Sequence, residues 1–249
     1  MYIVREQKII ASPEMRTGSE AQCLRDVFRQ QASEHLTAGK SLFLEGDRAE
    51  HVFEVVEGAL RIFKIISDGR RVITGFLYSG DIIGLAVGQR YLYSAEAISV
   101  ATVKRVSRRR FDLAVTDNQR LQPEFFALVS DEMAAAQDQM VLLSCKNAEE
   151  RICSFLLKFM KRNSLPGERR RNIELPMCRQ DIADYLGLTI ETVSRTFTKL
   201  IQKGVVSIEN SALRHTIAIE RPVLLARLAG DGEEVCWHEG LMAGQQAGH

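Results

Sequence analysis

Two short amphipathic helices joined by a tight turn are predicted between Cys178 and Lys203, and no other stretch constrains the fold of the chain as strongly. Gly187 stands where a left-handed turn needs a residue without a side chain. Thr189 has the residue type that begins a helix as an N-cap. The apolar residues expected to pack between the helices are Ile182, Ala183, Leu186, Val193, Phe197, Leu200 and Ile201. The residues left on the outer face of the second helix are Glu191, Ser194, Arg195, Thr198 and Lys199. The stretch therefore predicts a helix-turn-helix.

Positive charge is concentrated around this stretch, although the whole 249-residue chain carries a net charge of only +1. Residues 146–229 contain 15 lysines and arginines against 9 aspartates and glutamates, whereas residues 1–145 contain 18 against 19. A local excess of positive charge is what phosphate binding requires. The overall composition, 45% apolar and 26% charged, is ordinary for a globular protein and does not separate an enzyme from a binding protein.

Several classes of protein are not expected from the residues present. The cysteines are odd in number and no pair has Cys-x-x-Cys spacing, so neither a disulfide framework nor a zinc site is predicted. No segment approaches the roughly 18 apolar residues of a membrane span, and we expect a cytoplasmic protein with reduced thiols. No catalytic constellation of serine, histidine and aspartate, glycine-rich phosphate loop or metal-spaced histidines is present, so an enzyme is not expected.

Short strands are predicted from residue 36 to residue 110. Runs of β-branched and aromatic residues alternate there with glycines, and no proline interrupts a run. The expected strands are Ser41–Leu44, His51–Val56, Ala59–Ile66, Arg71–Leu77 and Ala97–Val106. This spacing favours an antiparallel barrel or jelly roll.

A long helix is predicted from Phe111 to about Lys146, followed by a hinge at residues 144–147. Its apolar residues step by four and three, as in a helix that packs against another along its length. These residues are Phe125, Val129, Met133, Ala136, Met140 and Leu143. We expect them to form the interface of a homodimer, because helix-turn-helix proteins usually bind two half-sites as dimers. The alternative is that the stripe packs within its own chain.

The segments around the helix-turn-helix complete a winged unit. A helix is predicted from Ala148 to Arg162, a short strand at Ile173–Leu175, a hairpin from Val205–Ile208 and Thr216–Ile219, and a helix from Pro222 to Leu228. The fold class is α+β. Five parts are expected: an N-terminal segment over residues 1–35, a β-roll over 36–112, a dimerisation helix and hinge over 113–146, a winged helix-turn-helix unit over 147–229, and a disordered tail over 230–249.

The order of β-roll, long helix and winged helix-turn-helix resembles the CRP/FNR family of bacterial transcription regulators. The resemblance extends from about residue 36 to residue 229. Its most specific part is the pattern Glu191-x-x-Ser194-Arg195, which is similar to the FNR and FixK branch. The cyclic-AMP receptor has an arginine before the glutamate, whereas this chain has Ile190.

The resemblance implies that Ile190, Glu191, Ser194 and Arg195 contact bases in a T-T-G-A half-site. The residue chemistry agrees, because Arg195 offers a fork that fits guanine O6 and N7. Glu191 can only accept hydrogen bonds and suits a cytosine or adenine amine, and Ile190 favours a thymine methyl. The implied operator is a palindrome of T-T-G-A and T-C-A-A separated by about six base pairs. The alternative is that Glu191 and Arg195 form a simple i,i+4 ion pair.

Contacts with DNA phosphates are expected from residues near helix starts and from basic side chains. The candidates are Arg179, Thr189, Thr192, Lys199, Arg214 and His215. A solvated surface role is the alternative for each of them.

No cofactor is expected in the β-roll. A cyclic-nucleotide receptor of this family needs a glutamate and an arginine for the ribose and cyclic phosphate, but this chain has Leu85 and Tyr93 there. Arg90 is a substitute that lies three residues too early. Cys23 alone cannot hold an iron-sulfur cluster. A haem on His35 or His51, or another small ligand in the roll, remains the alternative.

Cys178 is predicted to be the N-cap of the first helix of the motif, beside Arg179. Both the positive helix end and the arginine favour a thiolate, so we predict a redox-sensitive cysteine whose oxidation weakens DNA binding. The alternative is a small N-cap without a regulatory role. Cys145 and Cys153 are expected to be buried and inert.

The residues and the resemblance together predict a sequence-specific transcription regulator. It is expected to bind palindromic double-stranded DNA as a homodimer and to activate transcription by recruiting RNA polymerase. A dimeric repressor is the alternative, as is a regulator that depends on an effector in the roll. The sequence does not identify the target genes or the physiological signal.

Overall fold

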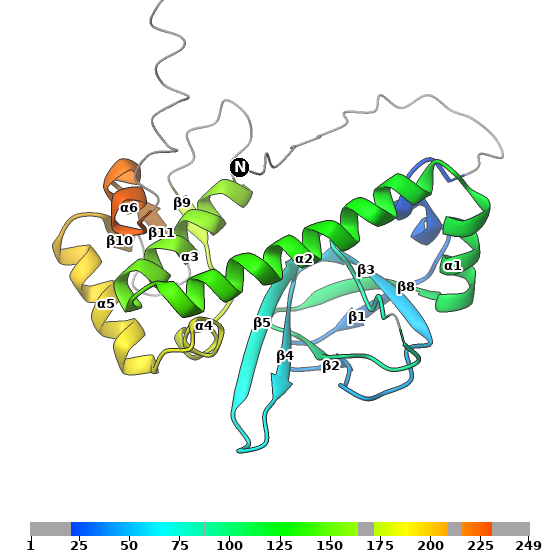
Figure 1. Ribbon diagram of the computed structural model, residues 1–249, viewed down its shortest axis with the longest axis horizontal. Coiled ribbons are helices and arrows are strands. Elements are labelled where there is room, and N and C mark those ends of the chain that lie inside the picture. The colour runs from blue at the N-terminus through cyan, green and yellow to red at the C-terminus, as the bar shows by residue number, and fades with distance from the viewer. Residues whose placement is uncertain (1–20, 87, 164–171, 209–215, 231–249) are drawn as a thin grey trace, which may run out of the picture.

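The computed structural model describes residues 21–86, 88–163, 172–208 and 216–230. Two β-sheets and six α-helices are present in these ranges, besides a small third sheet in the C-terminal part. Figure 1 shows a sheet-rich part and a helix-rich part, with one long helix running along both. We call the sheet-rich part, β1 to β8, the roll, and the helix-rich part, α3 to α6, the winged unit.

The roll consists of two four-stranded antiparallel sheets. One has the order β1 (Ser33–Leu36), β8 (Ala101–Ser107), β3 (His51–Glu57) and β6 (Ile82–Ile83). The other has the order β2 (Ser41–Phe43), β7 (Ser94–Ala97), β4 (Ala59–Ile65) and β5 (Arg71–Tyr78). Apolar side chains of both sheets meet in one core, because alternate residues of each strand point inward. The longest ladder joins β4 and β5, whose hairpin projects from the roll beside the winged unit (Figure 1).

Three helical segments cover one end of the roll. The 3₁₀ helix η1 (Leu24–Phe28) packs with α1 (Arg108–Asp117) and the start of α2 (Leu121–Cys145). Phe28, Phe111 and Leu121 are completely buried at this contact. From there α2 runs along the molecule to the winged unit (Figure 1).

The winged unit begins immediately after α2. Its elements are α3 (Ala148–Asn163), β9 (Asn172–Glu174), α4 (Arg179–Leu186), α5 (Ile190–Gln202), β10 (Val206–Ile208), β11 (Thr216–Ile219) and α6 (Pro222–Leu228). The three strands form a sheet of order β10-β11-β9. This arrangement is a winged helix-turn-helix, as the sequence predicts.

A continuous apolar core joins the winged unit to the roll. Phe63 and Ile73 of the roll are buried in the same cluster as the residues of α3, α4 and α5. The ring of Phe76 on β5 lies 6.4 Å from those of Phe155 and Phe159 and 5.3 Å from that of Tyr185. The position of α4 therefore depends on β5 as well as on its own unit.

The structure corrects the predicted strands in the roll. The run Ala97–Val106 is not one strand, because β7 and β8 belong to different sheets and the chain crosses between them at residues 98–100. The short strands β1 and β6 are also present, although the sequence did not predict them.

The predicted helix from Phe111 to Lys146 is also wrong in its extent. It is divided into α1 and α2 by Asn118, whose side chain donates to the Ala21 carbonyl at 2.7 Å and accepts from the Arg120 backbone at 3.0 Å. An asparagine that bonds to the backbone in this way competes with helical hydrogen bonds.

The structure also corrects one residue of α5. Ile201 is predicted to point inward, but it is 39% exposed.

Candidate functional site

The helix-turn-helix is formed by α4, α5 and the turn between them. Gly187 adopts φ +63°, a conformation that side chains disfavour, and its N–H bonds to the Ala183 carbonyl. Thr189 begins α5, and its hydroxyl accepts a hydrogen bond from the Thr192 N–H at 3.2 Å. The side chains buried between the helices include Ile182, Ala183, Leu186, Val193, Phe197 and Leu200, as predicted. These contacts fix the direction of α5 relative to α4.

The outer face of α5 presents the four residues predicted to contact bases. Ile190, Glu191, Ser194 and Arg195 are all exposed and line one shallow, open hollow. Apolar, acidic, hydroxyl and guanidinium groups therefore lie together on a surface about two helical turns long. This combination can offer hydrogen-bond donors, acceptors and an apolar contact to base edges at the same time.

Arg195 contacts the backbone of Glu191 and not its carboxylate. Its Nε donates to the Glu191 carbonyl at 3.3 Å, and no ion pair joins the two side chains in the described part of the chain. The simple i,i+4 ion pair is therefore not the arrangement that these side chains adopt. The pKa of Glu191 lies below its usual range because the carboxylate accepts from its own N–H and from the Thr189 hydroxyl, with a further effect of the Arg195 charge.

The residues predicted to contact phosphates are distributed around this face. Thr189 and Thr192 lie together at the start of α5, with their hydroxyl oxygens 3.1 Å apart, and Lys199 is exposed. Arg179, at the start of α4, places its guanidinium 3.4 Å from the centre of the Phe197 ring. Arg214 and His215 lie outside the described residues.

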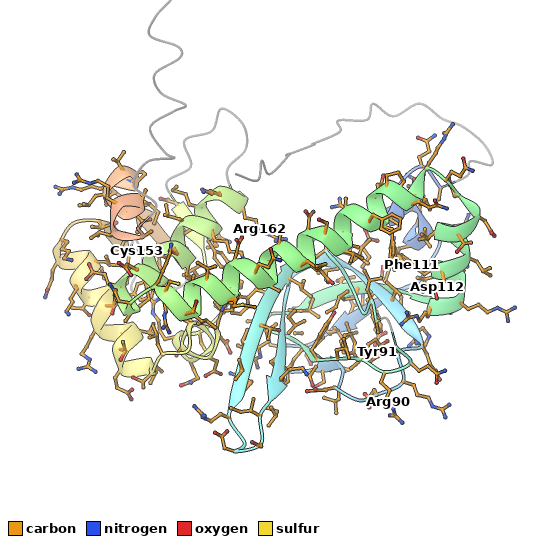
Figure 2. All side chains as sticks on the ribbon, in the orientation of Figure 1. Arg90, Tyr91, Phe111, Asp112, Cys153 and Arg162 are labelled. Atoms are coloured by element: carbon orange, nitrogen blue, oxygen red, sulfur yellow. The ribbon has the colours of Figure 1, made fainter. Side chains whose placement is uncertain are left out.

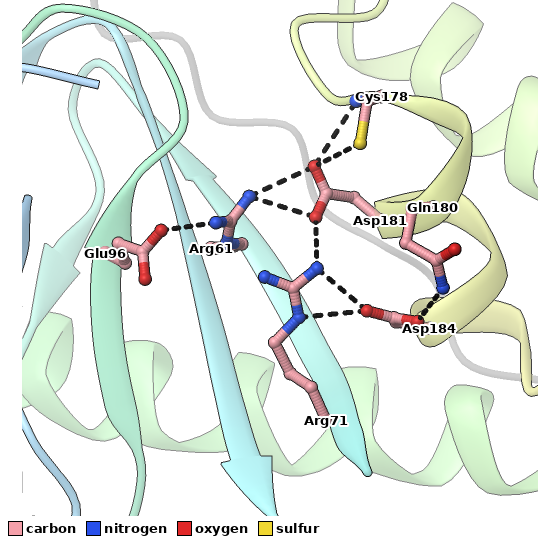
Figure 3. A network of polar contacts seen from close by, with 7 residues as sticks. All are labelled: Arg61, Arg71, Glu96, Cys178, Gln180, Asp181 and Asp184. Atoms are coloured by element: carbon pink, nitrogen blue, oxygen red, sulfur yellow. Dashed lines mark hydrogen bonds and ion pairs between the residues drawn. The ribbon is translucent and has the colours of Figure 1, made fainter. Parts of the chain in front are cut away.

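Cys178 is the N-cap of α4, as predicted, and its side chain is exposed. Its backbone N–H and its thiol Sγ both donate to the same oxygen, Oδ2 of Asp181, each at 3.3 Å. Figure 3 shows the sulfur directed toward this carboxylate. Only the protonated thiol can donate such a hydrogen bond, so the immediate partner of Cys178 is an acidic group and not the positive charge expected from the sequence.

Asp181 is also the centre of an ion-pair network that sequence reasoning missed (Figure 3). Arg61 of β4 donates through Nη1 to both of its oxygens, at 2.9 and 3.1 Å. Arg71 of β5 donates to Asp181 through Nη2 at 2.9 Å and to Asp184 through Nε at 2.9 Å. Arg61 also pairs with Glu96 of β7. An acidic residue three positions after an N-cap is a recognisable capping signal, but nothing in the sequence indicates its partners in the roll.

Aromatic side chains pack together in the interior of the roll. The Phe43 and Tyr91 rings stack at 3.8 Å, and those of Phe53 and Tyr93 lie 5.8 and 5.9 Å from Phe43. Figure 2 places Arg90 at the outer surface of the roll and Tyr91 inside it. Arg90 is exposed and donates to the Gly46 carbonyl.

The two histidines considered as haem ligands have other partners or surroundings. His35 Nδ1 lies 3.1 Å from the Thr102 hydroxyl. His51 lies beside the Phe53 ring, and its carbonyl accepts from the Tyr91 hydroxyl at 2.7 Å. No group of three or more metal-binding side chains occurs in the described ranges.

The predicted dimer residues occupy different environments on α2. Met133 and Met140 are 61% and 68% exposed, and Ala136 is also exposed. Val129 and Leu143 are half-buried. Phe125 packs within its own chain, where its ring lies 6.3 Å from that of Phe111. Its neighbour Phe126, which the sequence prediction left out, is 68% exposed.

The remaining cysteines differ in burial. Cys153 of α3 is completely buried, and this burial raises the pKa of its thiol to about 12. Cys145, at the end of α2, is exposed, so the prediction that it is buried is wrong.

None of the helices in the described part of the chain is long and apolar enough to span a membrane.

Comparison with known protein families gives one match in each part of the chain. The family model for the cyclic nucleotide-binding domain matches residues 33–118, and that for the crp family of bacterial regulatory proteins matches residues 175–206. The first match covers the roll and α1, and the second covers the helix-turn-helix.

Individual relatives match along most of the chain. The nitrogen fixation regulation protein FixK of Bradyrhizobium diazoefficiens is 40% identical over 174 residues, 70% of this chain and 73% of that protein. The transcriptional activatory protein AadR of Rhodopseudomonas palustris is 38% identical over 187 residues, 74% of this chain and 78% of that protein. The structure of FixK2 from Bradyrhizobium japonicum has a TM-score of 0.73 at 34% identity and covers 80% of this chain and 96% of that one. The chain therefore belongs to the CRP/FNR family of bacterial transcription regulators, in its FixK-like branch.

Proposed function

We propose that the protein activates transcription by binding, as a homodimer, to a palindrome of T-T-G-A and T-C-A-A half-sites separated by about six base pairs. The observation that carries this proposal is the shared hollow on α5, which is lined by Ile190, Glu191, Ser194 and Arg195. Arg195 reads a guanine, Glu191 accepts from a base amine, and Ile190 contacts a thymine methyl. Ser194 contributes a hydroxyl that can donate or accept.

Phosphate contacts orient this face on the duplex. We assign them to Arg179, Thr189, Thr192 and Lys199, together with Arg214 and His215 of the wing. The first four are supported by their positions at helix starts or on the outer face of α5. Such contacts strengthen binding to any sequence and make it depend on salt.

The dimer is proposed to form along α2. Met133, Ala136 and Met140 leave an apolar surface on this helix, and Phe126 extends it. Phe125, Val129 and Leu143 would border the contact, since each is partly packed within its own chain. We call the exposed surface of α5 formed by Ile190, Glu191, Ser194 and Arg195 the reading face. A symmetric contact along the 25 residues of α2 can present the reading faces of both protomers to one side of the DNA.

Selection of bound sequences from a random DNA pool tests this function. We expect recovered sequences to contain two inverted T-T-G-A half-sites with centres about one helical turn apart. Recovery of single or directly repeated half-sites would contradict the dimer, and recovery of an unrelated half-site would contradict the base assignments. Running the same selection with cyclic AMP, cyclic GMP or peroxide reports effector dependence.

Activation by recruitment of RNA polymerase is proposed over repression because the relatives include proteins named as transcriptional activators. In-vitro transcription with purified polymerase separates the two. Transcripts from a promoter carrying the palindrome should rise when the protein is added. A fall would support the alternative, a dimeric repressor.

Binding without a cofactor is supported by the aromatic stack of Phe43, Tyr91, Phe53 and Tyr93 within the roll. These rings leave the interior of the roll filled with apolar groups, and the arginine that should pair with a cyclic phosphate is absent from the position of Tyr93. Calorimetric titration with cyclic AMP and cyclic GMP should give no binding heat. Tight binding, or a haem absorbance band in the purified protein, would favour an effector-dependent regulator.

Redox control at Cys178 is a further part of the proposal. Once the thiol has given its proton to solvent and lost its hydrogen bond to Asp181, the thiolate would attack peroxide, forming a sulfur–oxygen bond as the oxygen–oxygen bond breaks and water is released. Further oxidation gives anionic groups beside the Asp181 carboxylate and near DNA phosphates, so binding should weaken. Cys178→Ser keeps a donor toward Asp181 and cannot be oxidised in this way. Equal losses of operator binding in wild type and Cys178→Ser after peroxide would remove Cys178 from the account.

A cytoplasmic location and the five-part division of the chain, residues 1–35, 36–112, 113–146, 147–229 and 230–249, also belong to this proposal. Expression of residues 147–229 alone would test the most consequential boundary. This fragment should fold with lower stability than in the whole chain, because it loses its contacts with Phe63, Ile73 and Phe76 of the roll, and should bind a single half-site weakly.

A further inference from the structure

We propose that Arg61 and Arg71 of the roll, by holding Asp181 and Asp184 of α4, act as positioning residues that determine which half-site spacing the dimer accepts. This inference rests on the proposed binding to a palindrome. We call these four side chains the clamp. They join the β4–β5 hairpin to the first helix of the helix-turn-helix (Figure 3).

The clamp holds α4 through directional contacts. The side chain of Asp181 is only 2% exposed, and its two oxygens accept from both arginines as well as from Cys178. Removing a carboxylate from water is unfavourable unless charge-assisted hydrogen bonds replace the lost hydration. Since those bonds come from the roll, α4 can leave the roll only by separating buried opposite charges.

Both arginines lie on strands that are paired within one sheet, so their backbone positions are fixed. Arg61 lies on β4 between its partners β5 and β7, and its second amine pairs with Glu96 of β7. Arg71 begins β5 and pairs through the ladder with Ile65 of β4. Burying such a network contributes little net stability compared with apolar packing, but it selects one orientation. A role in orientation therefore explains the network better than a role in stability.

Neighbouring contacts keep the winged unit close to the roll but constrain its direction less. Phe76 packs its ring among those of Phe155, Phe159 and Tyr185. Arg162 of α3 lies over the Tyr78 ring and pairs with Asp81 at 2.6 Å. The apolar contacts are non-directional, so alone they allow the unit to rotate on β5. The Arg162–Asp81 pair is directional, but its side chains are 44% and 27% exposed, so solvent screens it. The clamp is built on the buried Asp181 carboxylate and opposes the rotation more strongly.

The direction of α4 is transmitted to the reading face. The two helices pack together through the buried side chains of Ala183, Leu186, Val193 and Phe197. The turn at Gly187 that connects them is short. The hollow of Ile190, Glu191, Ser194 and Arg195 stays exposed while the clamp is formed, so the clamp is compatible with DNA binding. In a dimer joined along α2, fixing each winged unit against its own roll fixes the distance between the two reading faces.

Operators with different spacers test the clamp. Binding of full-length wild type, Arg71→Glu and Arg71→Glu/Asp184→Arg is measured at fixed salt on T-T-G-A palindromes with spacers of about five to eight base pairs. Wild type should prefer one spacing by at least about tenfold over the next. Arg71→Glu should reduce this preference to about twofold, and the double variant, which restores an opposite-charge pair, should recover most of it. Retention of the wild-type preference by folded Arg71→Glu would overturn the proposal.

Arg70→Glu is the matched control. Arg70 lies in the same hairpin, is highly exposed, and pairs only with Asp68 of the same turn among the described residues. Arg70→Glu makes the same change in charge as Arg71→Glu and should keep the wild-type preference for one spacing. If Arg70→Glu also loses this preference, the loss is caused by net charge, and the proposal is overturned. If Arg71→Glu does not fold, the neutral variant Arg71→Gln takes its place. It should reduce the preference for one spacing by about threefold or more.

Amide hydrogen exchange on the free protein separates failure of the clamp from failure of the proposed function. Arg71→Glu should accelerate exchange in α4 and β5 while the sheet of β9, β10 and β11 stays protected. Unchanged exchange in α4 and β5 would overturn the clamp even if DNA binding changes. If wild type binds no palindrome in the series, the half-site proposal fails, and the exchange result still decides whether these ion pairs hold the winged unit.

Discussion

Arg61 holds Asp181 through one nitrogen, Nη1, which lies 2.9 Å from Oδ1 and 3.1 Å from Oδ2, although 120 residues separate the two in the sequence. The carboxylate thus belongs both to the start of α4, where it accepts from Cys178, and to the surface of the roll. One side chain therefore stabilises a local helix start and a long-range contact.

Asp181→Asn should lower the free energy of unfolding by about 3 kcal/mol, because it removes the charge of the buried carboxylate that Arg61 and Arg71 share and leaves Arg61 paired only with Glu96 and Arg71 only with Asp184. Urea unfolding followed by circular dichroism measures the change. The control is Asp68→Asn in the exposed β4–β5 turn, which should leave the free energy of unfolding unchanged. If the two substitutions have equal effects on the free energy of unfolding, the ion pairs of Asp181 do not stabilise the fold.

Gly187→Ala should destabilise the protein by about 1–2 kcal/mol, since alanine must adopt φ +63° in the turn. A Cβ at this position would have ordinary contacts, the nearest being Leu143 at 3.5 Å, so backbone strain alone accounts for the effect. Thermal unfolding measures it. Gly88→Ala, in an open loop of the roll without a positive φ, is the control and should be neutral. A neutral Gly187→Ala would contradict the left-handed turn.

Cys145 and Cys178 should react with iodoacetamide in the native protein, whereas Cys153 should react only after unfolding. Burial raises the pKa of the Cys153 thiol to about 12, so almost none of it is thiolate at about pH 8. Its reactivity should increase only as the pH approaches that value. Peptide mass spectrometry after timed labelling identifies each site. Rapid native labelling of Cys153 at neutral pH would contradict its placement in the core of the winged unit.

Glu191 should keep its contribution to base recognition as the pH falls from about 7.5 to about 6. Hydrogen bonds from its own N–H and from Thr189 hold its pKa below the ordinary value of about 4.3. A group with a lowered pKa stays ionised above that value and loses its charge only when the pH falls through it. The ratio of operator dissociation constants for wild type and Glu191→Gln should therefore be constant over this range. A ratio that converges toward one by pH 6 would show protonation of Glu191.

The helix-turn-helix could be predicted in detail because its signals are local. Glycine at the turn, threonine at the N-cap and the apolar spacing of α4 and α5 all act within a few residues. The four predicted base-contacting residues consequently lie together on one exposed face. Ile201 was assigned to the wrong side because it lies at the margin of the apolar stripe, near the end of α5.

Long-range features could not be predicted in this way. The partners of Asp181 lie 120 and 110 residues away, and their pairing depends on how β4 and β5 face α4. The crossing between β7 and β8 depends on the packing of two sheets, whereas residues 97–106 alone have the composition of one strand. The break at Asn118 is stabilised by the carbonyl of Ala21, which is also distant in the sequence.

Arg195→Lys tests the proposed contact between Arg195 and the guanine of the T-T-G-A half-site. Lysine keeps the positive charge but replaces the rigid planar fork of Arg195 with one flexible ammonium group, so its contact with guanine O6 and N7 is less specific. Fluorescence anisotropy at fixed salt compares wild type and Arg195→Lys on the T-T-G-A palindrome and on the same palindrome with both guanines replaced by adenine. Wild type should lose at least about tenfold in affinity on the altered DNA, whereas Arg195→Lys should bind both DNAs within about threefold of each other. If Arg195→Lys discriminates between the two DNAs as strongly as wild type, Arg195 does not read the guanine.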